Sequence, residues 1–199
     1  MLYPDYYPEK CPYAPEHFPH LELTQEQLNA FYDKVTEHIS YVQEAGKSLG
    51  LTKDQLELHD YSKFSPQEYG AYAKHFHGGG APQEFAAAWL HHIHSNKHHW
   101  QYWIFPDGYT PRSTNIEQGV VEMPFLYQVE MIADWIGAGK AYTGSEDMTD
   151  WLSKNIGRIT LHSLTAASVS DLLRHLGYTD VVNEYGFRIR MNGELLYGS

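Results

Sequence analysis

Apolar residues recur at steps of three and four over residues 24–46, and this spacing is the strongest constraint on the fold of the chain. They are Leu28, Phe31, Val35, Ile39 and Val42. On an α-helix such residues lie above one another and form one apolar face. Thr24 precedes them and Gln27 follows three residues later, the arrangement of an N-terminal capping box. The segment predicts a long helix that begins at Thr24 and buries one face against neighbouring elements.

Similar start and stop signals predict further helices along the chain. We expect them over about residues 52–60, 65–77, 82–103, 124–137, 146–156 and 158–176. The clearest signal is Ser65 followed by Pro66 and Glu68, because it combines a cap, a proline at the first helical position and a glutamate at the third. The predicted class is therefore all-α, a bundle of helices forming one domain over residues 23–178.

The two ends of the chain differ from this helical body. Residues 1–22 hold five prolines among aromatic residues, and proline at this density is incompatible with a helix. We expect an extended, proline- and tyrosine-rich N-terminal arm that lies on the body or on a second copy of the chain in a homo-oligomer. Residues 179–199 form a tail in which Asn192-Gly193 suits the turn of a short β-hairpin.

The composition argues against several classes of protein. Fourteen Lys and Arg stand against 25 Asp and Glu, so the net charge is −11, which disfavours nucleic-acid duplexes and anionic membranes as partners. The single cysteine, Cys11, excludes an intrachain disulfide and suits a reducing compartment. There is no apolar run of roughly 20 residues and no signal-peptide pattern at the N-terminus. We therefore expect a cytoplasmic protein.

Histidine is the residue type that points to chemistry. The chain has 13 histidines, and five of them fall within residues 91–99. Histidine is the commonest metal ligand and the usual proton carrier near neutral pH. With one cysteine in the chain, any metal site is expected to use nitrogen and oxygen ligands.

Three further positions are candidate ligands, and each also has an ordinary structural explanation. His38 shares the apolar face of the first predicted helix, where it could equally be a core histidine bonded to a carbonyl. His59-Asp60 is an adjacent imidazole and carboxylate, a pair that also occurs on surfaces at helix ends. Asp134 interrupts an apolar helix, so it needs a partner or a metal unless it belongs to a solvent-facing stripe.

Two charged residues near these positions could take part in the chemistry. Lys63 lies one helical turn after Asp60, where its ammonium could meet a bound anion, or could form an ordinary ion pair. Glu130 lies one turn before Asp134. It is placed either as an acceptor for a ligand imidazole or as a base for water.

The order of a histidine, a His-Asp pair and a later aspartate resembles that of the HD-domain metallophosphohydrolase superfamily. The stretch from Asp60 to Lys63 is similar to the superfamily's His-Asp-x-Gly-Lys variant, with Ser62 where that variant has glycine. The residues around Asp134 are similar to those around the superfamily's last aspartate. The resemblance covers about residues 24–176 in helix order. It implies an HD-like helical bundle in which the four residues bind a divalent metal ion.

The histidines of residues 91–99 decide between two kinds of HD-like site. A mononuclear site needs only the four residues above, whereas a binuclear site needs two more histidines and is bridged by the shared aspartate. On one continuous helix, His91 and His98 would share a face, as would His92 and His99. We expect His92 and His98 as the additional ligands, with His91 and His99 as alternatives. This histidine-rich run also resembles a set of small phage and bacterial proteins.

Such ligands suit one or two divalent ions of Mn, Fe, Co, Ni or Zn. The resemblance implies hydrolysis of a nucleotide or another small-molecule phosphate ester. In that reaction Asp60 holds the ion, Lys63 neutralises phosphoryl charge, and Glu130 orients or deprotonates water. The aromatic side chains expected near enough to stack on a base are Tyr61, Phe64, Tyr69, Trp100 and Tyr102. Two other classes stay open: a di-iron enzyme of oxygen chemistry, and a non-enzymatic metal- or nucleotide-binding accessory protein.

Overall fold

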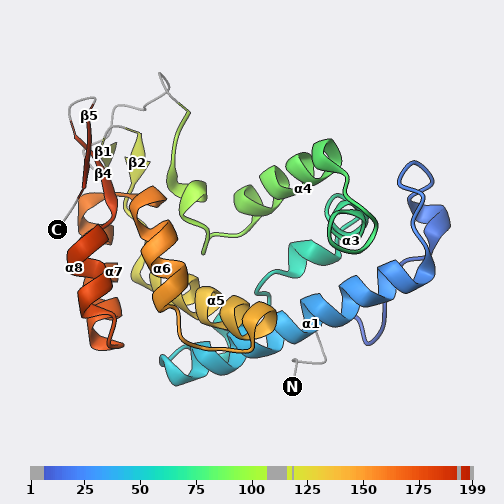
Figure 1. Cartoon of the computed structure of the whole chain (residues 1–199), viewed down its shortest axis with the longest axis horizontal. Helices are drawn as coiled ribbons and strands as arrows, with labels where there is room; N and C mark the ends of the chain where they lie inside the picture. The colour runs from blue at the N-terminus through green and yellow to red at the C-terminus, as the bar shows by residue number, and fades with distance from the viewer. Residues whose placement is uncertain (1–6, 107–115, 118, 192–193, 198–199) are drawn as a thin grey trace.

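A computed structural model describes residues 7–106, 116–117, 119–191 and 194–197, and these residues are predominantly helical, which confirms the all-α class (Figure 1). The α-helices are α1 (Gln25–Ser48), α2 (Lys53–Leu56), α3 (Tyr69–His77), α4 (Pro82–Ser95), α5 (Phe125–Thr143), α6 (Thr149–Asn155), α7 (Ser163–His175) and α8 (Thr179–Tyr185). The short 3-10 helices are η1 (Pro15–His17), η2 (Tyr61–Phe64), η3 (Trp100–Trp103) and η4 (Ile156–Arg158). Within the described ranges, no helix has the length and apolar character needed to cross a membrane.

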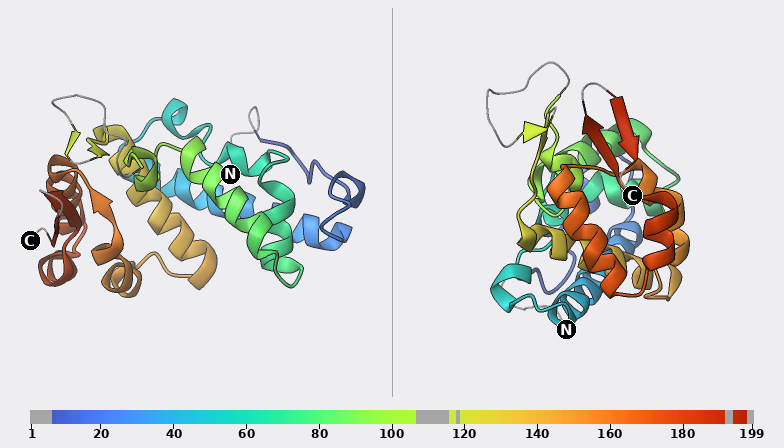
Figure 2. Two further views of the ribbon diagram at one scale, coloured as in Figure 1. Left: turned by 90° about the horizontal axis from the view of Figure 1, so that it is seen from above. Right: turned by 90° about the vertical axis from the view of Figure 1, so that its left-hand side faces the viewer.

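The two longest helices, α1 and α5, pack along each other and join the two ends of the molecule. The N-terminal arm, α3 and α4 lie at one end, and α6, α7 and α8 lie at the other (Figures 1 and 2). Each end has its own group of buried apolar side chains. The candidate ligands lie between these two groups, on elements that belong to both ends.

The long helix α1 follows the prediction closely. Thr24 is its N-cap and forms the capping box with Gln27, and the five apolar residues of the predicted stripe are all buried. His38 is buried on the same face. The apolar stripe therefore fixes which way His38 points, because the helix cannot bury one without the other.

Glycine allows α1 and α5 to approach closely. A Cβ atom built on Gly137 of α5 would lie 2.5 Å from Val42 Cγ2 and 2.7 Å from Val42 N. Backbone atoms cannot rotate out of such a contact, so a larger residue would push the helices apart. One turn before this contact, the two helices carry His38 and Asp134. The glycine thus sets the separation of two candidate ligands.

Several predicted helix boundaries were wrong. The start signal at Ser65 forms a turn, and α3 begins at Tyr69 with Glu68 as its N-cap. Helix α4 ends at Ser95, well before residue 103, because Asn96 adopts an extended backbone conformation. Helix α2 ends at Leu56, before the His-Asp pair. Helix α5 continues through Gly137 and ends only at a left-handed Gly144. The predicted helices 146–156 and 158–176 are the shorter α6 and α7.

The C-terminal tail contains the predicted hairpin and an unpredicted helix. Strands β4 (Arg188–Met191) and β5 (Glu194–Tyr197) pair antiparallel, while the Asn192-Gly193 turn lies outside the described residues. Strand β3 (Thr160–Leu161) adds to β4 in parallel, in the order β3-β4-β5. Helix α8 precedes β4. A small pair of antiparallel strands, β1 (Ile116–Glu117) and β2 (Val120–Val121), precedes α5.

The N-terminal arm lies on the body of the same chain over its described residues, as one of the two predicted arrangements requires. Tyr7 and Phe18 are buried, and the Tyr13 hydroxyl donates a hydrogen bond to the Phe64 carbonyl at 2.9 Å. The Tyr7 hydroxyl donates to the carbonyl of His59 at 2.7 Å. The arm therefore reaches the backbone of a candidate ligand.

Candidate metal centre

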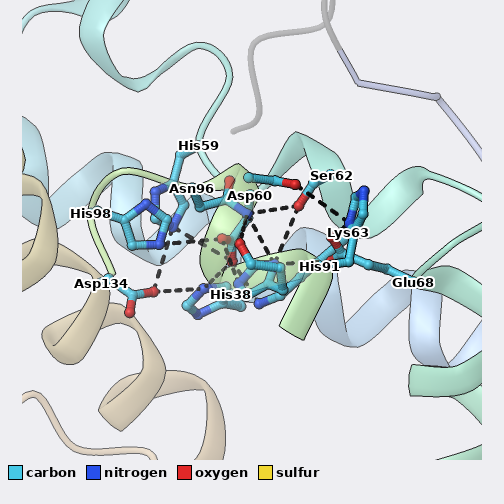
Figure 3. A network of polar contacts seen from close by, with 12 residues as sticks. His38, His59, Asp60, Ser62, Lys63, Glu68, His91, Asn96, His98 and Asp134 are labelled. Atoms are coloured by element: carbon cyan, nitrogen blue, oxygen red, sulfur yellow. Dashed lines mark hydrogen bonds and ion pairs between the residues drawn. The ribbon is translucent and has the colours of Figure 1, made fainter. Parts of the chain in front are cut away.

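The structure brings the four residues of the predicted mononuclear site together. His38 Nε2, from α1, lies 3.1 Å from both Asp60 Oδ2 and Asp134 Oδ1 (Figure 3). His59 Nε2 lies 3.7 Å from Asp60 Oδ2 and 3.5 Å from Asp134 Oδ1. All four donor atoms fall within 4.8 Å of one another. Helices α1 and α5 and the turn after α2 thus point imidazole and carboxylate groups at one place.

A second group of imidazoles faces the other oxygen of the same aspartate. Asp60 Oδ1 lies 3.3 Å from His92 Nε2 and 3.4 Å from His98 Nε2. His99 contributes a further donor within 4.8 Å of the others. Asp60 therefore stands between two groups, with Oδ2 directed at one and Oδ1 at the other. This is the arrangement that a bridging carboxylate needs.

The predicted pair His92 and His98 meets at Asp60, although the helical argument for the pair was wrong. His92 is on α4, whereas His98 and His99 follow the break at Asn96 and are placed by the turn between α4 and η3. His91 is 40% exposed and pairs with a glutamate outside the cluster. Of the two alternatives, His99 joins the group and His91 does not.

The centre contains buried polar atoms that lie near other ligand atoms without forming a hydrogen bond to them. His59 Nε2, Asp60 Oδ1, His98 Nε2 and His99 Nε2 have no hydrogen-bond partner within the described ranges. Unsatisfied buried polar atoms are rare because each costs about 1–3 kcal/mol. Here the four atoms belong to the two ligand groups that share Asp60, and imidazole nitrogens with carboxylate oxygens form a donor set for borderline or hard divalent ions. The residues therefore fit one or two metal ions.

Glu130 contacts the Nδ1 atoms of two of the imidazoles, on the side of each ring that faces away from the ligand cluster. Its Oε1 accepts from His59 Nδ1 at 2.9 Å and lies 3.2 Å from His98 Nδ1. A carboxylate on Nδ1 keeps the proton there and leaves Nε2 free to bind a metal. Of the two roles that the sequence left open for Glu130, its position on the outer nitrogens favours that of an acceptor.

Glu68 plays the same part for His92 and was missed in the sequence. Its Oε2 accepts from His92 Nδ1 at 2.9 Å, and its Oε1 lies 2.6 Å from His91 Nδ1. The side chain is fully buried. From the sequence we predicted that Glu68 helps to start a helix. The structure has a turn at Ser65 in place of that helix start, and Glu68 faces inward. The adjacent histidines on α4 were the available signal, because a buried imidazole needs an acceptor.

Lys63 lies against the shared aspartate. Its Nζ is 2.6 Å from Asp60 Oδ2, as the one-turn spacing predicts for an ion pair. Although burial favours the neutral acid, Lys63 and the histidines His59 and His92 hold the pKa of Asp60 well below its usual value. Burial opposes the charge of Lys63 too, but the carboxylate raises the pKa of this ammonium. The centre thus holds a fixed positive charge next to the proposed ligands.

The imidazoles differ in their electrostatic surroundings. Burial alone would lower the pKa of His59, but the carboxylates of Asp60, Asp134 and Glu130 raise it to about 10. Burial holds the pKa of His99 well below its usual value, and the neighbouring imidazoles lower it further. His99 is therefore neutral near pH 7 and ready to bind a metal, whereas His59 must lose a proton first.

The backbone at Asp60 is strained. Its φ and ψ are 56° and 18°, in the left-handed region that favours glycine. Strained residues of this kind cluster at functional sites, where the surrounding structure holds them in place. The Tyr7 hydroxyl on the preceding carbonyl is one such restraint. The strain allows His59 and Asp60 to point into one centre, although adjacent side chains on a helix diverge.

Two cavities open beside the centre. The tryptophan cavity, of about 660 Å³, lies among η3, α5 and α6 and is lined by residues that include Trp100, Trp135, Trp151 and Arg158. The lysine cavity, of about 430 Å³, lies among α1, α3 and α4 and is lined by residues that include Lys34, Lys63, Phe76 and Phe85. His99 and Asp134 line both. Of the five aromatic residues predicted to stack on a base, Trp100 is the one found in these linings.

A family model matches most of the chain. The family model described as a family of unknown function, DUF5662, matches residues 27–175. This range contains every candidate ligand and both glutamates behind them. No curated protein and no solved structure matches the chain.

Proposed function

The chain belongs to DUF5662, a family of unknown function, and from this premise we propose that it is a metal-dependent phosphohydrolase acting on a nucleotide or a related phosphate ester. The proposal extends the resemblance to the HD-domain superfamily. It is argued from the centre itself, since a fold alone does not define an activity.

The position of Asp60 carries the proposal. Its two oxygens face two imidazole groups that come from different elements, and unsatisfied donor atoms lie on both sides. His38, His59, Asp60 and Asp134 would hold one ion, and His92, His98 and His99 would hold a second with Asp60. Bound there, a divalent ion would lower the pKa of a coordinated water and polarise a phosphoryl oxygen.

The other residues prepare the centre for an anionic substrate. Lys63 keeps an ammonium at the edge of the ligand cluster, where it neutralises charge on a phosphoryl group. Glu130 and Glu68 hold protons on the outer nitrogens of three imidazoles, which fixes the direction of each ring. Asp60 and His59 are almost completely buried, so bulk water is excluded and electrostatic interactions in the centre are strong.

The test combines metal analysis with a hydrolysis screen. We expect more than one Mn, Fe, Co, Ni or Zn ion per chain, and release of phosphate or an alcohol from a panel of nucleotides and phosphate esters. Asp60→Ala should lose both ions and all turnover while keeping its helical circular dichroism. Asp33 is an exposed aspartate on α1, so Asp33→Asn is the matched control. It should keep both metal ions and full turnover.

Four results would contradict the proposal in different ways. Retention of stoichiometric metal by Asp60→Ala would remove Asp60 from the site. One ion or fewer per chain under metal-replete conditions would reduce the centre to the four-ligand form. Iron with oxygen-dependent turnover would select the di-iron alternative, and bound metal without turnover of any ester would select the accessory protein.

A further inference from the structure

The two cavities meet at the same edge of the metal centre. The residues that line both are His99, Asp134, Trp89, Ala138 and Tyr142, so the two cavities are adjacent at two candidate ligands. His98 lines the tryptophan cavity, and His38 and His92 line the lysine cavity. A phosphoryl group bound at this edge therefore has a separate space on each side. Each space lies within the size range of small-molecule sites.

The charges along the two cavities suit a weakly charged substrate. In the lysine cavity, Lys34 Nζ lies 2.6 Å from Glu37 Oε2, and Lys63 Nζ lies 2.6 Å from Asp60 Oδ2. Both ammonium groups are thus already paired with carboxylates. In the tryptophan cavity, the described lining residues include two aspartates, Asp147 and Asp150, and a single arginine, Arg158. Beyond the one phosphoryl group next to Lys63, a polyphosphate tail would meet Lys34, which already has a carboxylate partner, or the aspartates of the tryptophan cavity.

The two linings differ in chemistry. The tryptophan cavity combines indole faces with the side-chain amides of Gln101 and Asn155, which suits an aromatic group with hydrogen-bonding edges. The lysine cavity is walled by Tyr72, Phe76 and Phe85, which suits an apolar or aromatic group. Phe76 is 49% exposed and Trp151 is 42% exposed, so both offer open aromatic surface to a ligand.

We propose that the substrate is a phosphodiester with one organic group in each cavity, a nucleoside-like group on the tryptophan side and an apolar group on the lysine side. This inference rests on the proposed hydrolase function. A monoester has one organic group and carries close to two negative charges near neutral pH, whereas a diester has two groups and one charge. In the reaction a water oxygen bonds to phosphorus and one ester P–O bond breaks. The departing oxygen takes a proton to give an alcohol, and a phosphomonoester of the other group remains.

Three chromogenic esters with the same leaving group test the inference. They are thymidine 5′-(p-nitrophenyl phosphate), methyl p-nitrophenyl phosphate and p-nitrophenyl phosphate. For the metal-loaded chain, kcat/KM should be at least about tenfold higher for the thymidine diester than for the other two, because stacking of one base changes binding by about 5- to 150-fold. The methyl diester has the same charge but lacks the second large group, so it separates cavity occupancy from charge.

Substitutions in the linings of the two cavities test whether each cavity contacts the substrate. Trp151→Ala and Phe76→Ala should each lower kcat/KM for the thymidine diester about tenfold. Phe125→Ala is the matched control, because Phe125 is 59% exposed and is not among the residues that line either cavity. It should leave kcat/KM unchanged. Thermal unfolding of each variant checks that the fold is kept.

Binding to the metal-free chain separates the inference from the proposed function. Equilibrium dialysis, in which no turnover occurs, should give at least tenfold tighter binding of the thymidine diester than of the methyl diester. Equal or faster turnover of the monoester would overturn the diester inference and leave the hydrolase intact. If no ester is turned over by the metal-loaded chain, the hydrolase is refuted. The dialysis ratio then decides whether a two-group site remains, and equal binding overturns it.

Discussion

Gly137→Ala should weaken one metal ion selectively by separating α1 from α5. The added Cβ would lie 2.5 Å from Val42 Cγ2, 2.7 Å from its backbone N and 3.0 Å from its Cα, so two of the three close atoms belong to the backbone. Ordinary contact begins near 3.4 Å, so the helices would have to part by about 0.7–0.9 Å. Overpacking of this size costs about 1–3 kcal/mol of unfolding free energy.

The shift acts on the ligands one turn away. His38 and Asp134 lie on the two separated helices, and a metal site tolerates misplacement of only about 0.5 Å. We expect the affinity for the ion held by these two residues to fall about 10- to 100-fold. The ion held by His92, His98 and His99 uses no side chain of α1 or α5 except through Glu130, so its affinity should change less than about threefold.

The measurements are metal titration by calorimetry and urea denaturation of the metal-free chain. Gly139→Ala is the control, because it adds the same methyl group to the same helix but directs it at the Ser145 carbonyl of an exposed loop. Both variants gain the same helix propensity, about 1 kcal/mol. The difference between their unfolding free energies therefore isolates the contact with Val42. If Gly137→Ala leaves the affinity for both ions unchanged, or if the two variants have equal unfolding free energies, then the close contact of α1 and α5 does not set the positions of the ligands.

Three further predictions concern the charged residues. Glu130→Gln should weaken the binding of both ions about 10- to 100-fold, because it removes the negative charge next to the Nδ1 atoms of His59 and His98; unchanged metal titrations would contradict this. Lys63→Gln should lower kcat about 100-fold while both ions stay bound, and loss of metal instead would make Lys63 structural. The unfolding free energy of the metal-free chain should be highest between about pH 4.5 and 6.5. The lowered pKa of Glu130, about 2 against an ordinary 4.5, contributes stability that is lost as pH falls through 2. The raised pKa of His59, about 10 against 6.5, contributes stability that is lost as pH rises through 10. Urea denaturation measured from about pH 2 to about pH 10 is the test. An unfolding free energy that stays constant over this whole range would refute the contributions of Glu130 and His59.

Local signals in the sequence predicted the elements that they control directly. The capping box at Thr24 and the apolar stripe after it fix both the start of α1 and the inward direction of His38. The carboxylate of Asp134 on an apolar helix predicted a buried charge with partners, and the structure gives it His38 and His59. In both cases the information lies within one helix.

The remaining features depend on contacts between segments far apart in the sequence. Glu68 faces inward because Ser65 starts a turn in place of a helix, and its partners are more than 20 residues away. His98 and His99 reach the centre because α4 stops at Ser95, whereas the helical pattern continued. Tertiary contacts overrode local propensity at both positions, and both border the metal centre. Helix α8 was missed because its seven residues carry little periodic pattern.

The left-handed backbone at Asp60 lowers the stability of the fold, whereas the proposed metal centre needs the carboxylate at this position. Glycine is the residue that adopts this conformation without cost, but Asp60→Gly alone would leave the buried Lys63 ammonium without its carboxylate partner. Random mutagenesis with selection for heat resistance in the presence of a chelator should therefore enrich Asp60→Gly only together with a substitution that removes the charge of Lys63. The same selection with metal present should eliminate it, because the bridging carboxylate is then worth more than the relieved strain. The outcome of laboratory evolution at this codon would thus report directly on whether metal binding is what has kept an aspartate there.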